Sequence, residues 1–100
     1  MKLSDLIQGI EYECVQGDVD REITELVYDS RKIVAGSVFV CICGAVSDGH
    51  EYVSQASEKG AAAVIVQKDV QVDDSVAVIR VENTRLALAE ASAAYFGHPA

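Results

Sequence analysis

The sequence of 100 residues has no tryptophan, a single proline and only eight basic residues against sixteen acidic ones. Because the lysines and arginines are scattered, no basic stripe could follow a nucleic-acid backbone. The longest apolar runs, SVFVCIC and AAAVIV, are too short to span a bilayer, and the N-terminus MKLSDLIQGI has no signal-peptide hydrophobic region. The sequence therefore predicts a cytoplasmic protein that binds neither nucleic acid nor a membrane.

Cysteine is also scarce, with three residues at Cys14, Cys41 and Cys43. The last two are separated by one residue in an apolar run, so on a strand they point to the same face. A structural zinc needs four ligands, and no second Cys or His pair stands at a usable spacing. We therefore predict no metal site, and expect small buried thiols. A thiol-based metal or redox protein is the alternative.

Half of the residues are apolar and there is no low-complexity run, which indicates one ordered domain. Alternating or continuous apolar patterns predict four strands, and the second of them reads as a central strand covered on both faces. The predicted strands span residues 22–28, 37–43, 61–66 and 75–81.

Helical spacing and end signals predict about three helices. A short one lies in LSDLIQG with Ser4 as a possible N-cap, and a second begins at the N-cap Asp48 and ends at Gly60. The last begins at Asn83 and is closed by Gly97. Its predicted buried face consists of Leu86, Ala89, Ala93 and Phe96.

The order of elements over residues 37–66 is strand, helix, strand, which predicts a βαβ unit with parallel strands. The fold class is therefore α/β, a small domain of two or three layers with a mostly parallel or mixed sheet. In such sheets ligands bind beyond the carboxyl ends of the strands. The stretch CICGAVSDGHEY, residues 41–52, occupies that place, and its backbone N–H groups from Gly49 onward would suit a phosphate. An ordinary connection with Asp48 as its cap is the alternative.

No catalytic motif accompanies this loop. The sequence contains no G-x-x-x-x-G-K-[ST], no G-x-G-x-x-G and no G-x-S-x-G, and His50-Glu51 is not followed by a second His at the zinc-protease spacing. We therefore predict no catalytic residue in this chain.

Two long stretches, ITELVYDSRKIVAGSVFVCICGAVSDGHEYVSQASEKGAAAVIV and NTRLALAEASAAYFGHPA, resemble the N-terminal domain of the Mur ligase family. The resemblance covers nearly the whole chain. Its most specific parts are the DSR triplet at Asp29, Ser30 and Arg31, the DGHEYVSQASEKGAAAVIV block and the closing YFGHPA. Within the family, the last helix is more similar to the ligases that add a diamino acid than to the sister ligases that add D-Ala-D-Ala.

The resemblance implies that residues 1–100 bind the UDP-N-acetylmuramoyl part of a peptide substrate in peptidoglycan biosynthesis. ATP and Mg²⁺ would serve a central ATPase domain of the same chain, which is absent here, as is a C-terminal domain. The complete enzyme would be a monomer that joins meso-diaminopimelate or L-lysine to UDP-MurNAc-L-Ala-D-Glu. The alternatives are the D-Ala-D-Ala ligase or a free-standing α/β ligand-binding module.

The resemblance also implies a set of substrate-binding residues. Ser30 matches the serine of the DSR turn, and Tyr28 stands where the family places a residue against the nucleotide. The loop after residue 43 matches the family's nucleotide-contacting loop, for which backbone contacts are expected. The predicted substrate-binding residues are Tyr28, Ser30, Arg31, Gly44, Ala45, Val46, Ser47, Asp48 and His50.

Overall fold

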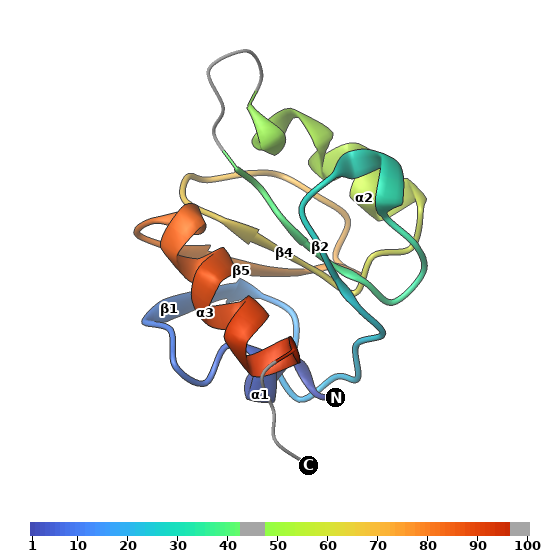
Figure 1. Ribbon diagram of the computed structural model, residues 1–100. Coiled ribbons are helices and arrows are strands. Elements are labelled where there is room, and N and C mark those ends of the chain that lie inside the picture. The colour runs from blue at the N-terminus through green and yellow to red at the C-terminus, as the bar shows by residue number, and fades with distance from the viewer. Residues whose placement is uncertain (43–47, 97–100) are drawn as a thin grey trace.

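The computed structural model describes residues 1–42 and 48–96 (Figure 1). Its centre is a five-stranded sheet with the strand order β1-β5-β4-β3-β2. The strands are β1 (Tyr12–Gln16), β2 (Leu26–Val27), β3 (Val38–Val40), β4 (Ala63–Val66) and β5 (Ala77–Val81). The helices are α1 (Leu3–Leu6), α2 (Val53–Glu58) and α3 (Thr84–Phe96), with the 3₁₀ turns η1 (Ser30–Lys32) and η2 (Gly49–Tyr52).

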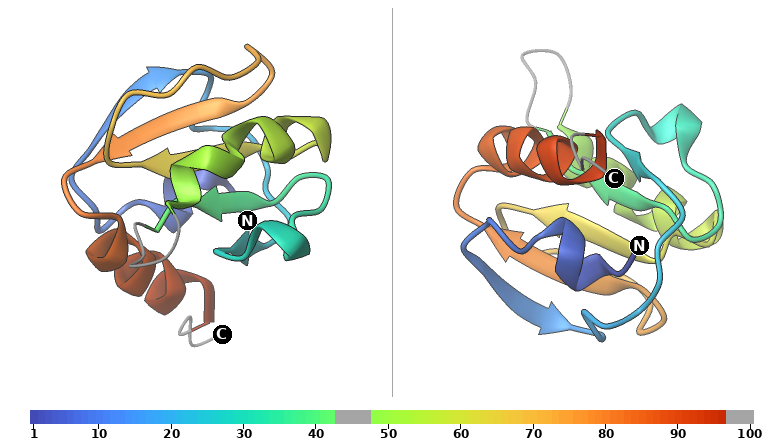
Figure 2. Two further views of the ribbon diagram at one scale, coloured as in Figure 1. Left: turned by 90° about the horizontal axis from the view of Figure 1, so that it is seen from above. Right: turned by 60° about the horizontal axis from the view of Figure 1, so that its bottom comes forward.

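The molecule has three layers, which confirms the predicted α/β class. Helices α1 and α3 lie together against one face of the sheet, and α2 lies against the other (Figures 1 and 2). Each face has its own apolar core. Val38, Val40 and Ile65 face α1 and α3, whereas Phe39 and Val64 face α2. This is the alternation that a strand covered on both sides requires.

Four strands, β2 to β5, are parallel, and only β1 is antiparallel, to β5. The predicted βαβ unit is confirmed, because α2 connects β3 to the adjacent parallel strand β4. Gly60, the predicted end of that helix, has φ +84°, the left-handed conformation that favours glycine after a helix.

The predicted central strand is confirmed as an interior one, because β3 is fully buried and pairs with both β2 and β4, although the middle position of the five belongs to β4. The strand pattern differs from the prediction at the edges. The strand expected over residues 22–28 is reduced to the two residues of β2. Strand β1 was not predicted, because four of its five residues are exposed and the sequence YECVQ has no apolar face to reveal it.

The predicted cap of the first helix is wrong. Ser4 lies inside α1, and the N-cap position is taken by Lys2, whose side chain makes no capping hydrogen bond. The helix is held by burial of Leu3 and Leu6 and of the next residue, Ile7.

The start of α3 is as predicted, because the Asn83 side chain accepts from the backbone N–H groups of Arg85 (2.9 Å) and Leu86 (3.2 Å). The predicted buried face is wrong. Thr84, Ala87 and Ala91 face the core, whereas all four residues of the predicted face are exposed. Since α3 has small or apolar residues on nearly every side, helical spacing alone could not indicate which face is inside. The predicted closing residue Gly97 lies outside the described residues.

Cys41 is fully buried, as expected of a small apolar thiol, and Cys14 is exposed. Cys43 lies outside the described residues. Along residues 1–42 and 48–96, no helix has the length and apolar character to cross a membrane.

Candidate functional site

A pocket of about 580 Å³ lies at the carboxyl ends of β2 and β3, on the α2 side of the sheet. Its size is within the range of small-molecule sites. The turn η1 contributes to its lining from one direction, and η2 with the start of α2 from another. The lining residues are Tyr28, Asp29, Ser30, Arg31, Phe39, Ile42, Gly49, Tyr52 and Gln55.

The η1 turn is fixed by an internal ion pair. Asp29 Oδ1 accepts from the backbone N–H of Arg31 (2.9 Å), and the same carboxylate accepts from Arg31 Nε (3.2 Å) and Nη2 (2.9 Å). These hydrogen bonds lower the pKa of Asp29 to about 2 and raise the pKa of Arg31. The charges of Asp29 and Arg31 largely cancel, and Lys32 adds one positive charge to the turn.

A second contact holds η1 against the helix behind it. Lys59, directly after α2, donates from Nζ to the backbone oxygen of Ser30 (2.9 Å). Ser30 is therefore held at the pocket wall by its own backbone. Tyr28, just before the turn, is 65% exposed and lies among the lining residues, so part of its ring is available to a ligand.

On the opposite side, η2 approaches the end of β3 very closely. The backbone N–H of Gly49 donates to the oxygen of Ile42 (2.9 Å). A Cβ at this position would lie 2.7 Å from the nitrogen of Ile42 and 3.0 Å from the Cα of Cys41. Only glycine allows η2 to come this close to the end of β3.

His50 is turned away from the pocket and into the fold, with only 4% of its side chain exposed. Its Nε2 accepts from the backbone N–H of Gln67 (3.0 Å), so the ring proton is on Nδ1, which donates to Asp48 Oδ1 (2.6 Å). The backbone N–H of His50 donates to the same oxygen (2.9 Å). The predicted cap at Asp48 is thus confirmed, and His50 bridges η2 and the end of β4.

Asp48 also forms an ion pair with Lys68. The hydrogen bond from Lys68, followed by those from His50, holds the pKa of Asp48 well below its usual range. One carboxylate therefore joins the start of η2 to the segment after β4.

The expectation that the start of this helix offers free N–H groups is wrong for the first three residues. Gly49 donates to Ile42, His50 to the Asp48 side chain, and Glu51 to the backbone oxygen of Asp48 (3.0 Å). These donors are used inside the fold and cannot also hold a phosphate without leaving their acceptors.

The predicted site residues thus fall into three groups. Tyr28, Ser30 and Arg31 line the pocket together, whereas Asp48 and His50 support it from behind. Gly44, Ala45, Val46 and Ser47 lie outside the described residues. Sequence reasoning missed several lining residues, and the helical spacing of Tyr52 and Gln55 beside the predicted loop was a signal for those two. The lining residues that the predicted set lacks are Asp29, Phe39, Ile42, Gly49, Tyr52 and Gln55.

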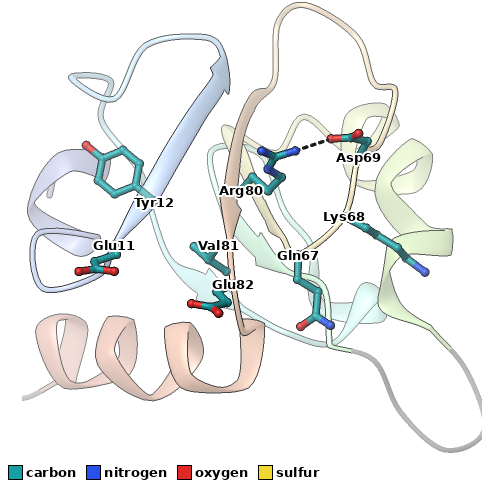
Figure 3. A pocket seen from close by; sticks show the side chains of 8 residues that line it. All are labelled: Glu11, Tyr12, Gln67, Lys68, Asp69, Arg80, Val81 and Glu82. Carbon is teal, nitrogen blue, oxygen red and sulfur yellow. Dashed lines mark hydrogen bonds and ion pairs between the residues drawn. The ribbon is translucent and has the colours of Figure 1, made fainter.

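A larger pocket, about 640 Å³, lies at the same carboxyl end of the sheet, beside the ends of β4 and β5 (Figure 3). Arg80 points toward Asp69 (3.0 Å) and also pairs with Glu13 (2.6 Å), while Lys68 pairs with Asp48. Lys68 and Arg80 are outnumbered in this lining by Glu11, Asp69 and Glu82, so this pocket is net negative and suits an anionic ligand less well than the pocket between η1 and η2, where Arg31 is balanced by Asp29.

Among residues 1–42 and 48–96, no group of three His, Cys, Asp or Glu side chains is placed to hold a metal ion.

Comparison with known proteins assigns the family. The protein-family model described as "Mur ligase family, catalytic domain" matches residues 22–96 of this chain. UDP-N-acetylmuramoyl-L-alanyl-D-glutamate–2,6-diaminopimelate ligases from Clostridium perfringens and Clostridioides difficile are 42% and 43% identical over 99 residues, which is 99% of this chain and 20% of each relative. The chain spans about a fifth of the length of the relatives it matches.

Solved structures agree with this. MurF from Acinetobacter baumannii superposes with a TM-score of 0.80 at 26% identity, covering 93% of this chain and 20% of that one. MurF ligase from Thermotoga maritima in complex with ADP gives 0.63 at 29% identity, covering 73% of this chain and 17% of that one. The chain therefore belongs to the Mur ligase family.

Proposed function

We propose that residues 1–100 form the N-terminal domain of a ligase that adds a diamino acid to UDP-MurNAc-L-Ala-D-Glu, and that this domain binds the UDP-N-acetylmuramoyl part of the substrate. The observation that carries the proposal is the pocket between η1 and η2, which brings Tyr28, Ser30 and Arg31 together at the carboxyl ends of two parallel strands. The names of the relatives support the choice of substrate.

The chemistry of the pocket suits a nucleotide with polar ends. The exposed ring of Tyr28 offers an apolar face for uracil, and the Ser30 hydroxyl can donate or accept a hydrogen bond at the base or ribose. The hydrogen bonds from the Arg31 N–H to Asp29 and from Lys59 to the Ser30 oxygen hold the η1 turn in place, which reduces the ordering needed when the ligand binds. We assign the neighbouring loop of Gly44, Ala45, Val46 and Ser47 to backbone contacts with the same ligand, on the basis of the family resemblance.

The chemical step belongs to the rest of the complete enzyme. The sequence holds no phosphate-binding Gly-Lys-Ser/Thr motif, so ATP and Mg²⁺ would be held by a central ATPase domain of the same chain, where the substrate carboxylate is activated. We propose that the complete enzyme is a monomeric, cytoplasmic, ATP-dependent ligase and that this domain serves it by holding the substrate. Purified residues 1–100 should then show no ATP turnover above a mock preparation.

The sister ligase that adds D-Ala-D-Ala is the second candidate, because one superposed structure from Acinetobacter baumannii is titled a D-alanyl-D-alanyl ligase and the others are named MurF. The sequence relatives named for diaminopimelate addition are more similar, at 42–43% identity against 26–29%. The diaminopimelate type is therefore favoured.

Hydrogen exchange of the full-length enzyme tests the pocket, with and without UDP-MurNAc-L-Ala-D-Glu. Bound substrate should slow exchange in the segments that contain η1 and η2 and leave β1, on the far edge of the sheet, unchanged. Protection confined to segments outside the pocket would place the nucleotide elsewhere.

A further inference from the structure

Helix α3 presents a second apolar face to the outside. Leu86, Ala89, Ala93 and Phe96 recur at intervals of three and four residues, so they form one stripe along the helix, which we call the outer stripe. Within the described residues all four are exposed, Leu86 at 60% and Phe96 at 74%. The stripe lies opposite the core-facing Ala87 and Ala91. A helix that is apolar on both sides is usually buried on both sides in the complete protein.

The ends of the outer stripe are shaped for contact. At its C-terminal end the ring of Phe96 packs edge-to-face on Tyr95, with centroids 4.6 Å apart and an interplanar angle of 89°, so the exposed ring is already ordered. At its N-terminal end Leu86 borders a hollow of about 470 Å³, which is large enough to accept an incoming side chain and whose lining combines apolar residues with carboxylates: Ile10, Val81, Glu11, Glu82 and Glu90.

The charges of α3 are placed at the sides of the stripe. Arg85 and Glu90 are both exposed and flank the apolar residues. An apolar centre with a charged rim is the usual composition of a protein interface. Isolated exposed apolar residues elsewhere, such as Val15 on β1, have no such arrangement and need no partner.

We propose that, in the complete enzyme, the outer stripe is covered by the part of the polypeptide that follows residue 100. This rests on the proposed function, under which a central domain comes next in the chain. The relatives are about five times as long as this chain, and α3 is the last element of the described residues, so a following segment would continue from the Phe96 end of the stripe. Such a tether raises the effective concentration of the following segment far above that of a second copy.

Hydroxyl-radical footprinting of the full-length enzyme tests the proposal without substrate. Labelling of each side chain is corrected for its intrinsic reactivity by comparison with the urea-unfolded chain. Leu86 and Phe96 should be protected several-fold relative to Val15 and Val34, which are 49% and 46% exposed in this domain and serve as internal controls. Labelling of Leu86 and Phe96 equal to or above the controls would overturn the proposal.

Dilution separates the two possible occupants. Protection that stays constant as the enzyme is diluted supports a cover from the same chain. Protection that disappears on dilution, together with a larger species in sedimentation, would assign the stripe to a second copy and overturn the proposal.

A variant completes the test. Phe96→Ser in the full-length enzyme should reduce the protection of Leu86 several-fold, whereas the matched control Val15→Ser should leave it unchanged. Unchanged Leu86 protection in both variants would show that the cover does not depend on the stripe, which contradicts the proposal. The footprinting is done without ligand. A full-length enzyme that failed to bind UDP-MurNAc-L-Ala-D-Glu would therefore count against the proposed function alone.

Discussion

The backbone N–H of Gln67 donates to Nε2 of His50 across 3.0 Å, which joins the end of β4 to the turn that lines the pocket. The Gln67 side chain continues the connection, because its Oε1 accepts from the backbone N–H (3.0 Å) and hydroxyl (2.9 Å) of the buried Thr84 at the start of α3. Gln67, the residue directly after β4, therefore holds both η2 and the start of α3 in place.

His50→Ala should destabilise the protein by about 1–3 kcal/mol, because it removes a side chain that is only 4% exposed and takes away the acceptor of the Gln67 N–H. Urea unfolding measures the change in free energy. The neighbouring exposed Glu51→Ala is the control and should stay within about 0.5 kcal/mol of the parent. Equal losses in the two variants would show that the His50 bridge contributes nothing specific.

Asp48 should give the protein an acid-sensitive component of stability. Its pKa is lowered in the folded state, so its contribution is fully present above the unfolded value of about 3.9 and is lost as the pH falls toward the folded value. The free energy of unfolding should therefore decrease below about pH 4.

Asp48→Asn should lower stability at pH 7 and weaken that dependence, because the amide does not titrate. Urea unfolding at pH 7, 4 and 3 follows both effects. Asp74→Asn, in an exposed loop, controls for the lost charge and should keep the slope of the parent. A slope unaffected by Asp48→Asn would assign the acid sensitivity to other groups.

The parts of the fold that could be predicted from the sequence are those in which a local pattern is compatible with only one structure. The continuous apolar runs of β3 and β4 read as buried strands, and Gly60 marked a helix end because few other residues accept its φ. Strand β1 could not be predicted in this way, since its exposed side chains contribute no apolar pattern.

The candidate site was predictable only in part. Resemblance pointed to Tyr28, Ser30 and Arg31, and the structure brings them to one pocket. The role of His50 could not be predicted, because its partner is the backbone N–H of a residue 17 positions away, Gln67. A backbone N–H is present whatever side chain stands at position 67. A local pattern carries no information about such a contact.

Gly49→Ala should disturb the pocket directly. The new methyl group would meet backbone atoms of Ile42 at 2.7 Å, and backbone cannot move aside as a flexible side chain can. The expected loss is about 1–3 kcal/mol of stability, as for overpacking elsewhere, together with weaker substrate binding because η2 must shift. Thermal unfolding and substrate titration measure the two effects.

Gly9→Ala is the matched control, since its added Cβ would meet only a Glu90 side-chain oxygen at 3.5 Å, an ordinary contact. It should be neutral or slightly stabilising. A Gly49→Ala variant that behaves like Gly9→Ala would mean that the close approach of η2 to β3 is not required.

Ser30→Ala should separate binding from folding. Two hydrogen bonds with backbone groups hold the turn around Ser30, one from Lys59 Nζ to the Ser30 oxygen and one from the Arg31 N–H to the Asp29 side chain. Neither involves the Ser30 hydroxyl, so both remain when it is removed. Stability should therefore change by less than about 0.5 kcal/mol. A single neutral hydrogen bond to the ligand contributes about 0.5–1.5 kcal/mol, so KM for UDP-MurNAc-L-Ala-D-Glu should rise about two- to tenfold in the full-length enzyme.

The expected kcat of Ser30→Ala is close to that of the parent, because a contact far from the reacting carboxylate binds ground state and transition state alike. Steady-state kinetics at saturating ATP distinguish the two constants. Ser54→Ala, an exposed serine on α2 outside the pocket lining, is the control and should leave KM unchanged. If Ser30→Ala instead unfolds the domain while KM stays constant, the hydroxyl belongs to the fold and Ser30 is removed from the site.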